Sequence, residues 1–146
     1  MGLHFSKQEF SNRKTNVLNS MKQQNIDALL MFRQESMYWL TGYDTFGYVF
    51  FQTLVLDKSG NTILLTRAPD LRQAQNTSNI QDIRIWVDKD GINPTDDLKL
   101  ILEELELKNK IIGVEYEAYG MTGRNALRLN KSLENYCRVE DQSELI

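Results

Sequence analysis

Carboxylates are the most numerous side chains in this 146-residue chain that could bind a metal ion or exchange protons. A metal centre needs several His, Cys, Asp or Glu ligands that converge on one point. The candidates form three groups: Asp96 and Asp97, then Glu103, Glu104 and Glu106, and finally Glu115 and Glu117. None has the spacing of a metal site, and His4 is the only histidine. We therefore predict that these carboxylates face solvent and that the chain holds no metal ion.

Cys137, the only cysteine, is the one candidate for covalent chemistry. A cysteine nucleophile needs a positioned base, and the chain offers only His4, so we interpret Cys137 as a buried structural residue. The segment Gly120-Met-Thr-Gly-Arg124 precedes a predicted helix, where a phosphate could bind. It lacks a third glycine and a Walker lysine, which favours an ordinary turn. The residues alone therefore predict no catalytic residue.

Aromatic side chains are concentrated in one stretch, since seven of the 14 lie between Tyr38 and Phe51. Aromatic runs are most often buried core. Gly42 and Gly47 interrupt this run, however, and Asp44 lies within it. Part of the stretch must therefore turn at the surface.

The composition is that of one soluble globular domain, with 41% hydrophobic and 25% charged residues. A net charge of −3 offers no basic surface for nucleic acid. No run of 18 apolar residues predicts a membrane helix, and the N-terminus lacks a signal-peptide core. A single cysteine is typical of a reducing compartment, so we expect a cytoplasmic protein with no membrane contact.

Helix and strand signals alternate along the chain. A capping box at Ser6–Glu9 and the pair Asn93-Pro94 mark two helix starts. Apolar spacing predicts helices at 6–24, 34–40, 71–76, 93–105 and 122–133, and strands at 26–32, 49–56, 62–66, 83–87, 111–114 and 136–139. The polar turn 57–61 requires an antiparallel pair. The prediction is an α/β fold with a mixed central β-sheet flanked by helices.

The last four residues, Ser143-Glu-Leu-Ile146, read as the opening turn of another helix. Their apolar pair is expected to face nothing within this chain. This pattern predicts the N-terminal piece of a longer protein.

Three passages, in this order and at these separations, resemble the N-terminal domain of the creatinase/prolidase/aminopeptidase P family. The first is Met37–Tyr43 (MYWLTGY), which is similar to the family's aromatic, Leu/Ser/Thr-Gly, aromatic motif. The second is Ile112–Tyr116 (IGVEY), which resembles the penultimate strand. The third is Arg138–Ile146, which looks like the join to a catalytic domain. The resemblance covers the whole chain.

The resemblance implies a ribonuclease-H-like fold for residues 1–140, with residues 141–146 opening a linker helix to an absent C-terminal catalytic domain. That "pita-bread" domain would carry the Asp, His and Glu ligands for divalent metal ions (Mn, Zn or Co), and this chain would need no cofactor. The resemblance also implies a homodimer, in which this domain lines the active site of the partner subunit.

Substrate contacts are carried over from creatinases, where a Phe and an Arg two residues later reach the substrate across the dimer. Tyr48 keeps the aromatic and Phe50 replaces the Arg, so the guanidinium that would pair with a carboxylate is missing. Arg67 and Arg72 are possible substitutes, with surface ion pairing as the alternative. The candidate substrate-contact residues are Tyr43, Phe46, Tyr48, Phe50 and Arg67. We expect residues 37–40 and 49–51 to pack in the core and residues 43–48 to form an exposed rim.

The resemblance thus predicts a non-catalytic domain of a metal-dependent hydrolase that cleaves a C–N bond in an Xaa-Pro peptide or a small creatine-like solute. Two alternatives stay open. One is a free-standing binding or dimerisation module, and the other is the domain of a lyase relative.

Overall fold

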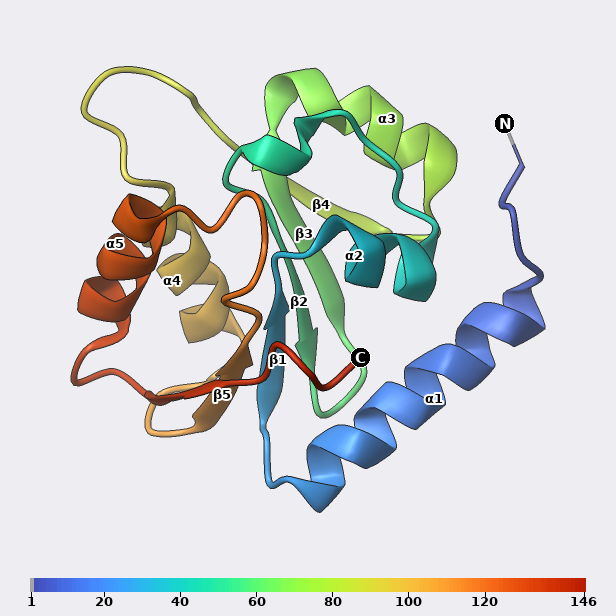
Figure 1. Cartoon of the computed structure of the whole chain (residues 1–146), viewed down its shortest axis with the longest axis horizontal. Coiled ribbons are helices and arrows are strands. Elements are labelled where there is room, and N and C mark those ends of the chain that lie inside the picture. Colours follow the sequence, from blue (N-terminus) through green and yellow to red (C-terminus); the bar gives the residue numbers. More distant parts are fainter. Residues whose placement is uncertain (1) are drawn as a thin grey trace.

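Six strands form one sheet in the order β4-β3-β2-β1-β5-β6 (Figure 1). The computed structural model describes residues 2–146; Met1, the first residue of the predicted domain, lies outside them. The strands are β1 (Ala28–Met31), β2 (Thr53–Asp57), β3 (Thr62–Arg67), β4 (Asp82–Trp86), β5 (Ile111–Val114) and β6 (Arg138–Asp141). β2 runs antiparallel to both β1 and β3, and the remaining pairs are parallel. The predicted mixed sheet is confirmed.

Helices cover both faces of this sheet (Figure 1). They are α1 (Lys7–Gln23), α2 (Gln34–Thr41), α3 (Leu71–Thr77), α4 (Pro94–Glu104) and α5 (Gly123–Leu133), with short 3-10 helices η1 (Gly47–Val49) and η2 (Ala68–Asp70). α4 and α5 pack on one face, and α1, α2 and α3 pack on the other. The chain is therefore a three-layer α/β domain, as predicted.

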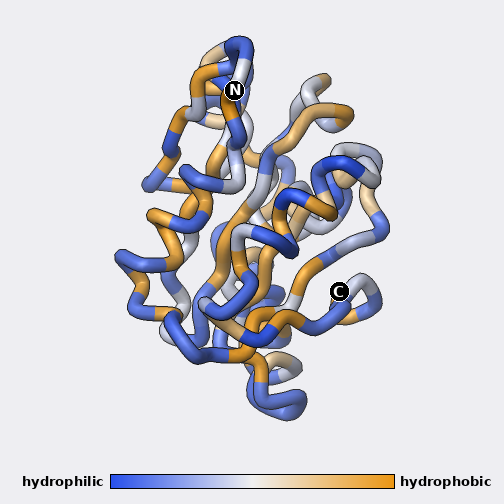
Figure 2. The backbone as a smooth tube through the Cα atoms, turned by 90° about the vertical axis from the view of Figure 1, so that its left-hand side faces the viewer, coloured by the Kyte–Doolittle hydropathy of each residue, from blue (hydrophilic) through white to orange (hydrophobic). Residues whose placement is uncertain are grey.

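The sheet divides the hydrophobic core into two halves, because the side chains of each strand alternate between its two faces. In β1, Leu30 faces the α4–α5 side while Leu29 and Met31 face the α1–α3 side. Successive strand side chains point to opposite faces, so apolar residues at every position of β1 bury both. The hydrophobic segments gather towards the middle of the molecule, and hydrophilic ones follow the outer helix turns (Figure 2).

Helix starts follow the predicted capping signals. The Ser6 hydroxyl accepts a hydrogen bond from the Glu9 amide at 3.1 Å, and the Asn93 side-chain oxygen accepts one from the Thr95 amide at 3.2 Å. The Glu9 carboxylate does not complete a capping box, because it binds Arg13 at 2.9 Å.

Two predicted strands are displaced. The strand predicted at 49–56 begins only at Thr53, because residues 47–49 wind into η1. The strand predicted at 136–139 is β6, two residues later, because Asn135 turns with a φ of 59° and Tyr136 packs into the α4–α5 core.

The predicted helix start at residues 143–146 is wrong for the described chain, which forms a turn there. The Ser143 hydroxyl is buried and accepts hydrogen bonds from the amides of Tyr116 and Glu117. Leu145 and Ile146 pack against the α1–α3 core, so the expectation that they face nothing is also wrong.

None of the helices described for residues 2–146 has the length and apolar character needed to cross a membrane.

The α4 helix tests the contribution of the core directly. We expect Leu102→Ala, at a fully buried position, to lower the free energy of unfolding by about 2–5 kcal/mol, because it removes packed atoms and leaves a cavity. The matched control is Leu100→Ala on the same helix, where the side chain is 62% exposed and the loss should stay below about 0.5 kcal/mol. Urea unfolding measures both, and equal losses would contradict the assigned helix face.

Candidate functional site

Five exposed apolar side chains gather where two loops meet beyond the sheet. Phe46 is 91% exposed and Tyr119 is 75% exposed, which is unusual for aromatic residues. The rings of Tyr48 and Tyr119 meet edge to face, with centroids 5.7 Å apart. We call the surface formed by Phe46, Tyr48, Val49, Phe50 and Tyr119 the aromatic rim.

The two loops that carry the aromatic rim lie against each other. One leads from α2 through η1 to β2, and the other joins β5 to α5; Figure 1 shows η1 beside the latter loop. A side chain at Gly120 would put its Cβ 2.4 Å from the Phe50 carbonyl oxygen. The absence of a side chain at Gly120 therefore permits this close approach.

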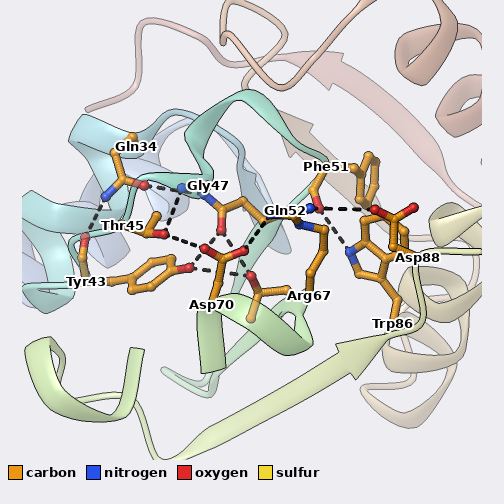
Figure 3. Close-up of polar contacts among 11 residues, drawn as sticks. Gln34, Tyr43, Thr45, Gly47, Phe51, Gln52, Arg67, Asp70, Trp86 and Asp88 are labelled. Atoms are coloured by element: carbon orange, nitrogen blue, oxygen red, sulfur yellow. Dashed lines mark hydrogen bonds and ion pairs between the residues drawn. The ribbon is translucent and has the colours of Figure 1, made fainter. Parts of the chain in front are cut away.

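Asp70 fixes the position of η1 from below (Figure 3). Its carboxylate accepts a hydrogen bond from the Thr45 hydroxyl at 2.7 Å, and that hydroxyl accepts one from the Gly47 amide at 2.9 Å. A Cβ on Gly47 would lie 2.4 Å from Asp70 Oδ1, so a side chain there would have to displace the hydrogen-bonded Asp70 carboxylate. The rim is thus a supported surface rather than a free loop.

Tyr43 anchors the other end of the same loop. Its hydroxyl donates to Gln52 Oε1 at 2.8 Å, and its carbonyl accepts from Gln34 Nε2 at 2.7 Å (Figure 3). Thr66 joins the network by donating to Gln52 Oε1 at 3.1 Å. Burial raises the pKa of the Tyr43 hydroxyl above its ordinary value, which keeps it protonated as a donor.

The structure divides the aromatic stretch differently from the prediction. Phe46 and Tyr48 are exposed at the rim as expected, but the placement of Tyr43 there is wrong, because its side chain is fully buried. A residue that follows a left-handed glycine at a helix end commonly packs back on that helix, and Gly42 is such a glycine. This signal could have placed Tyr43 inside.

The placement of Val49 and Phe50 in the core is also wrong, since both are largely exposed. Phe51 does pack inside, and its carbonyl accepts a hydrogen bond from Trp86 Nε1 at 3.0 Å. The β-branched and aromatic composition of residues 49–56 had put all three on a strand, but that strand begins only at Thr53.

Arg67 lies under the rim, and its two terminal nitrogens are paired while its buried Nε has no hydrogen-bond partner among the described residues. Its guanidinium carbon is 3.5 Å from the centroid of the Phe50 ring. The guanidinium also pairs with Asp70 at 3.2 Å and with Asp88 at 3.6 Å. The structure therefore brings Arg67 and Phe50 into contact, and Arg67 forms ion pairs at a largely buried position rather than at the surface.

Three residues of this site were not found from the sequence. Asp70 lies three positions after Arg67, a spacing that could have suggested an ion pair, and Tyr119 precedes a glycine near a helix start. Asp88 carries no signal, because only the β3–β4 pairing brings it to Arg67. Arg72, the other candidate cation, is exposed on α3.

Glu115 corrects the prediction that the Glu115–Glu117 pair faces solvent. Glu117 is exposed, but Glu115 is completely buried at the end of β5. Its carboxylate accepts hydrogen bonds from the Ser36 hydroxyl at 2.5 Å and from the Arg33 amide at 3.1 Å. Glu115, which follows β5, therefore binds polar groups at the N-terminal end of α2. Burial raises its pKa, against the lowering effect of these donors.

Cys137 is half-buried beside the α4–α5 core. Burial raises the pKa of its thiol to about 11, which leaves it protonated and weakly nucleophilic at neutral pH. The segment 120–124 forms the cap of α5 through Thr122, consistent with an ordinary turn. Among residues 2–146, no three His, Cys, Asp or Glu side chains lie close enough together to hold a metal ion.

Residues 13–146 match the family described as Creatinase/Prolidase N-terminal domain. The chain belongs to this family. Two curated relatives with hydrolase names also match this chain. The "Uncharacterized hydrolase/peptidase y4tM" of Sinorhizobium fredii is 30% identical over 140 residues, which cover 91% of this chain and 36% of that protein. The "Ectoine hydrolase" of Halomonas elongata is 25% identical over an alignment of 160 residues, which covers 100% of this chain and 38% of that protein.

Solved structures of the same type share the fold of this creatinase/prolidase N-terminal domain. A prolidase from Thermococcus sibiricus superposes with a TM-score of 0.78 at 14% identity, over 97% of this chain and 36% of that one. An aminopeptidase P from Streptococcus thermophilus gives 0.71 at 20% identity, over 93% and 94% of the two chains. The present chain spans little more than a third of the curated relatives that it matches.

The close contact between Gly47 of η1 and the Asp70 carboxylate predicts that Gly47→Ala destabilises this creatinase/prolidase N-terminal domain. The added Cβ would meet the Asp70 carboxylate, so we expect a loss of about 1–3 kcal/mol in the free energy of unfolding. Gly123→Ala is the matched control, because open space surrounds that position. Denaturant midpoints of the two variants measure the difference, and equal midpoints would show that η1 does not rest on Asp70.

Glu115 predicts a pH dependence with a defined sign. The folded chain holds this proton more tightly than the unfolded chain, whose Glu pKa is near 4.5, so the stabilisation is complete below pH 4.5 and is lost as the pH rises through the raised value. We expect the unfolding free energy of Glu115→Gln to fall less with rising pH than that of the unsubstituted chain.

Exposed Glu134→Gln is the control for this measurement and should keep the original pH slope. Comparison with the unsubstituted chain isolates Glu115, because the carboxylates with lowered pKa values act in the opposite direction in both proteins: Asp27, Asp82, Glu104 and Asp141. Identical slopes for Glu115→Gln and the unsubstituted chain would refute the assignment.

Proposed function

We propose that this chain is the non-catalytic N-terminal domain of a longer metal-dependent hydrolase, and that its aromatic rim lines the active site of a second subunit in a homodimer. The observation that carries this proposal is the rim itself: exposed apolar rings on a backbone that Asp70 and two close-packed glycines hold in place. Monomeric soluble proteins rarely expose such a supported aromatic surface without a partner.

The names of the relatives support a hydrolase as the parent protein. Both curated relatives are named as hydrolases, and both are almost three times as long as the region they share with this chain. We place the metal ions, Mn, Zn or Co, in the remainder of such a parent. The single Cys137 supports a cytoplasmic location for it.

The substrate class in this proposal is a compound with a hydrolysable C–N bond. The structural neighbours named prolidase and aminopeptidase P favour an Xaa-Pro peptide. The relative named ectoine hydrolase favours a small creatine-like solute. Both kinds of substrate are small enough to be enclosed between an aromatic wall and a second subunit.

Tyr48→Ala in the longer parent tests the proposal, since Tyr48 belongs to the rim and packs on Tyr119. We expect kcat/KM for the Xaa-Pro dipeptide or solute that the parent hydrolyses to fall by about 10–100-fold at unchanged metal content, because a positioning wall is lost. The control is Leu127→Ala, at an exposed position on α5 outside the rim.

Sedimentation of the same variants reports the dimer. Phe46→Ser should weaken self-association by about tenfold or more if the rim is an interface hot spot, while Leu127→Ala should leave it unchanged.

A parent protein that hydrolyses no such substrate with any divalent metal would contradict the proposal that it is a hydrolase. Elimination products would point to a lyase, and a gene encoding only this domain would favour a free-standing binding module.

A further inference from the structure

Arg67 is the one side chain in a cation–π contact with the rim among the described residues. The Phe50 ring covers one side of its guanidinium, Asp70 lies 3.2 Å from Nη2 and Asp88 lies 3.6 Å from Nη1, while the buried Nε has no hydrogen-bond partner within residues 2–146. Only 14% of the Arg67 side chain is exposed. A guanidinium that is stacked and paired in this way cannot also form a fork with a ligand carboxylate.

The charge that solvent can reach at this place is negative. The Asp88 side chain is 59% exposed, although it contacts Arg67 at 3.6 Å. The exposed segment around it, residues 88–90, reads Asp-Lys-Asp and carries a net negative charge. A ligand that approaches Phe50 therefore meets a carboxylate before it meets the buried cation.

The remaining ligand-facing groups are aromatic faces. Because the rings of Tyr48 and Tyr119 meet edge to face, they cannot cover each other's faces completely, and both stay exposed. Ring faces carry partial negative charge and attract organic cations, most strongly when water is excluded. Aromatic faces beside an accessible carboxylate are the combination that recognises ammonium and amidinium groups.

We infer that the aromatic rim receives a positively charged organic group of the substrate, an ammonium or amidinium, and not its carboxylate. This inference rests on the proposed function, because a second subunit would complete and dry the site. It assigns Tyr48, Tyr119 and Asp88 as the groups that determine specificity. Arg67 then acts as a positioning residue that holds Phe50 and Asp88 in place.

The test titrates the isotope-labelled chain with tetramethylammonium chloride, acetamidinium chloride and sodium acetate, at constant ionic strength set with sodium chloride. Amide NMR signals of Tyr48, Phe50, Tyr119 and Gly120 report the rim. Both cations should shift these signals with half-saturation on the order of 100 mM, because each exposed cation–π contact is weak. Acetate should leave them unchanged.

Two variants separate the parts of the site. Tyr119→Leu should reduce the cation-induced shifts at the other rim positions by about threefold or more, since a ring face is lost. Asp88→Asn should reduce them as well and should introduce a response to acetate, because Arg67 loses one of its two carboxylates. Leu127→Ala should behave as the unsubstituted chain.

The outcomes bear separately on the inference and on the proposed function. Larger rim shifts with acetate than with the cations would overturn cation recognition. So would no saturable shift with either cation in a chain that still self-associates through Phe46, a result that leaves the proposed function intact. Asp88 is exposed, so Asp88→Asn keeps the test decisive even if Tyr119→Leu fails to fold.

Discussion

The hydrogen bonds and ion pair of the buried Asp70 carboxylate are the interactions on which the aromatic rim depends. The carboxylate lies at the corner between β3 and α3, where it receives the Thr45 hydroxyl and the Arg67 guanidinium. A buried carboxylate is costly unless donors surround it, so the loop that supplies Thr45 is held against this corner. Gly47 closes the contact, because its missing side chain lets η1 rest on the carboxylate. The loop that carries the exposed rings of the rim is thus held in place by the buried hydrogen bonds of Asp70.

A second buried carboxylate fixes the other half of the surface. Glu115 joins the end of β5 to the start of α2, and Ser143 ties the backbone after β5 to the turn after β6. The loop that carries Tyr119 follows directly. Both halves of the rim therefore lie next to buried carboxylates that are hydrogen-bonded inside the domain, which favours a preformed surface over one that orders on binding.

The pairing of Arg67 changes the electrostatic reading of this family member. A free arginine at this place would select a carboxylate, whereas an arginine shared by two aspartates and covered by a phenyl ring supports the surface from within. The accessible groups are then aromatic faces and Asp88. Electrostatic complementarity of this kind sets specificity more than affinity, which agrees with the role that we propose for the rim.

The sequence by itself determined the order of elements, the mixed sheet and the family. Apolar periodicity and capping residues such as Ser6 and Asn93 act over a few neighbouring positions, so local reasoning finds them. The tertiary structure decided which aromatics are exposed and which charges are buried. Tyr43 turns inward and Phe50 outward because of partners 9 to 23 positions away and the glycine contact at Asp70. The contacts of Glu115 with Ser36 and of Arg67 with Asp88 depend on the pairing of neighbouring strands, which brings together residues far apart in the chain.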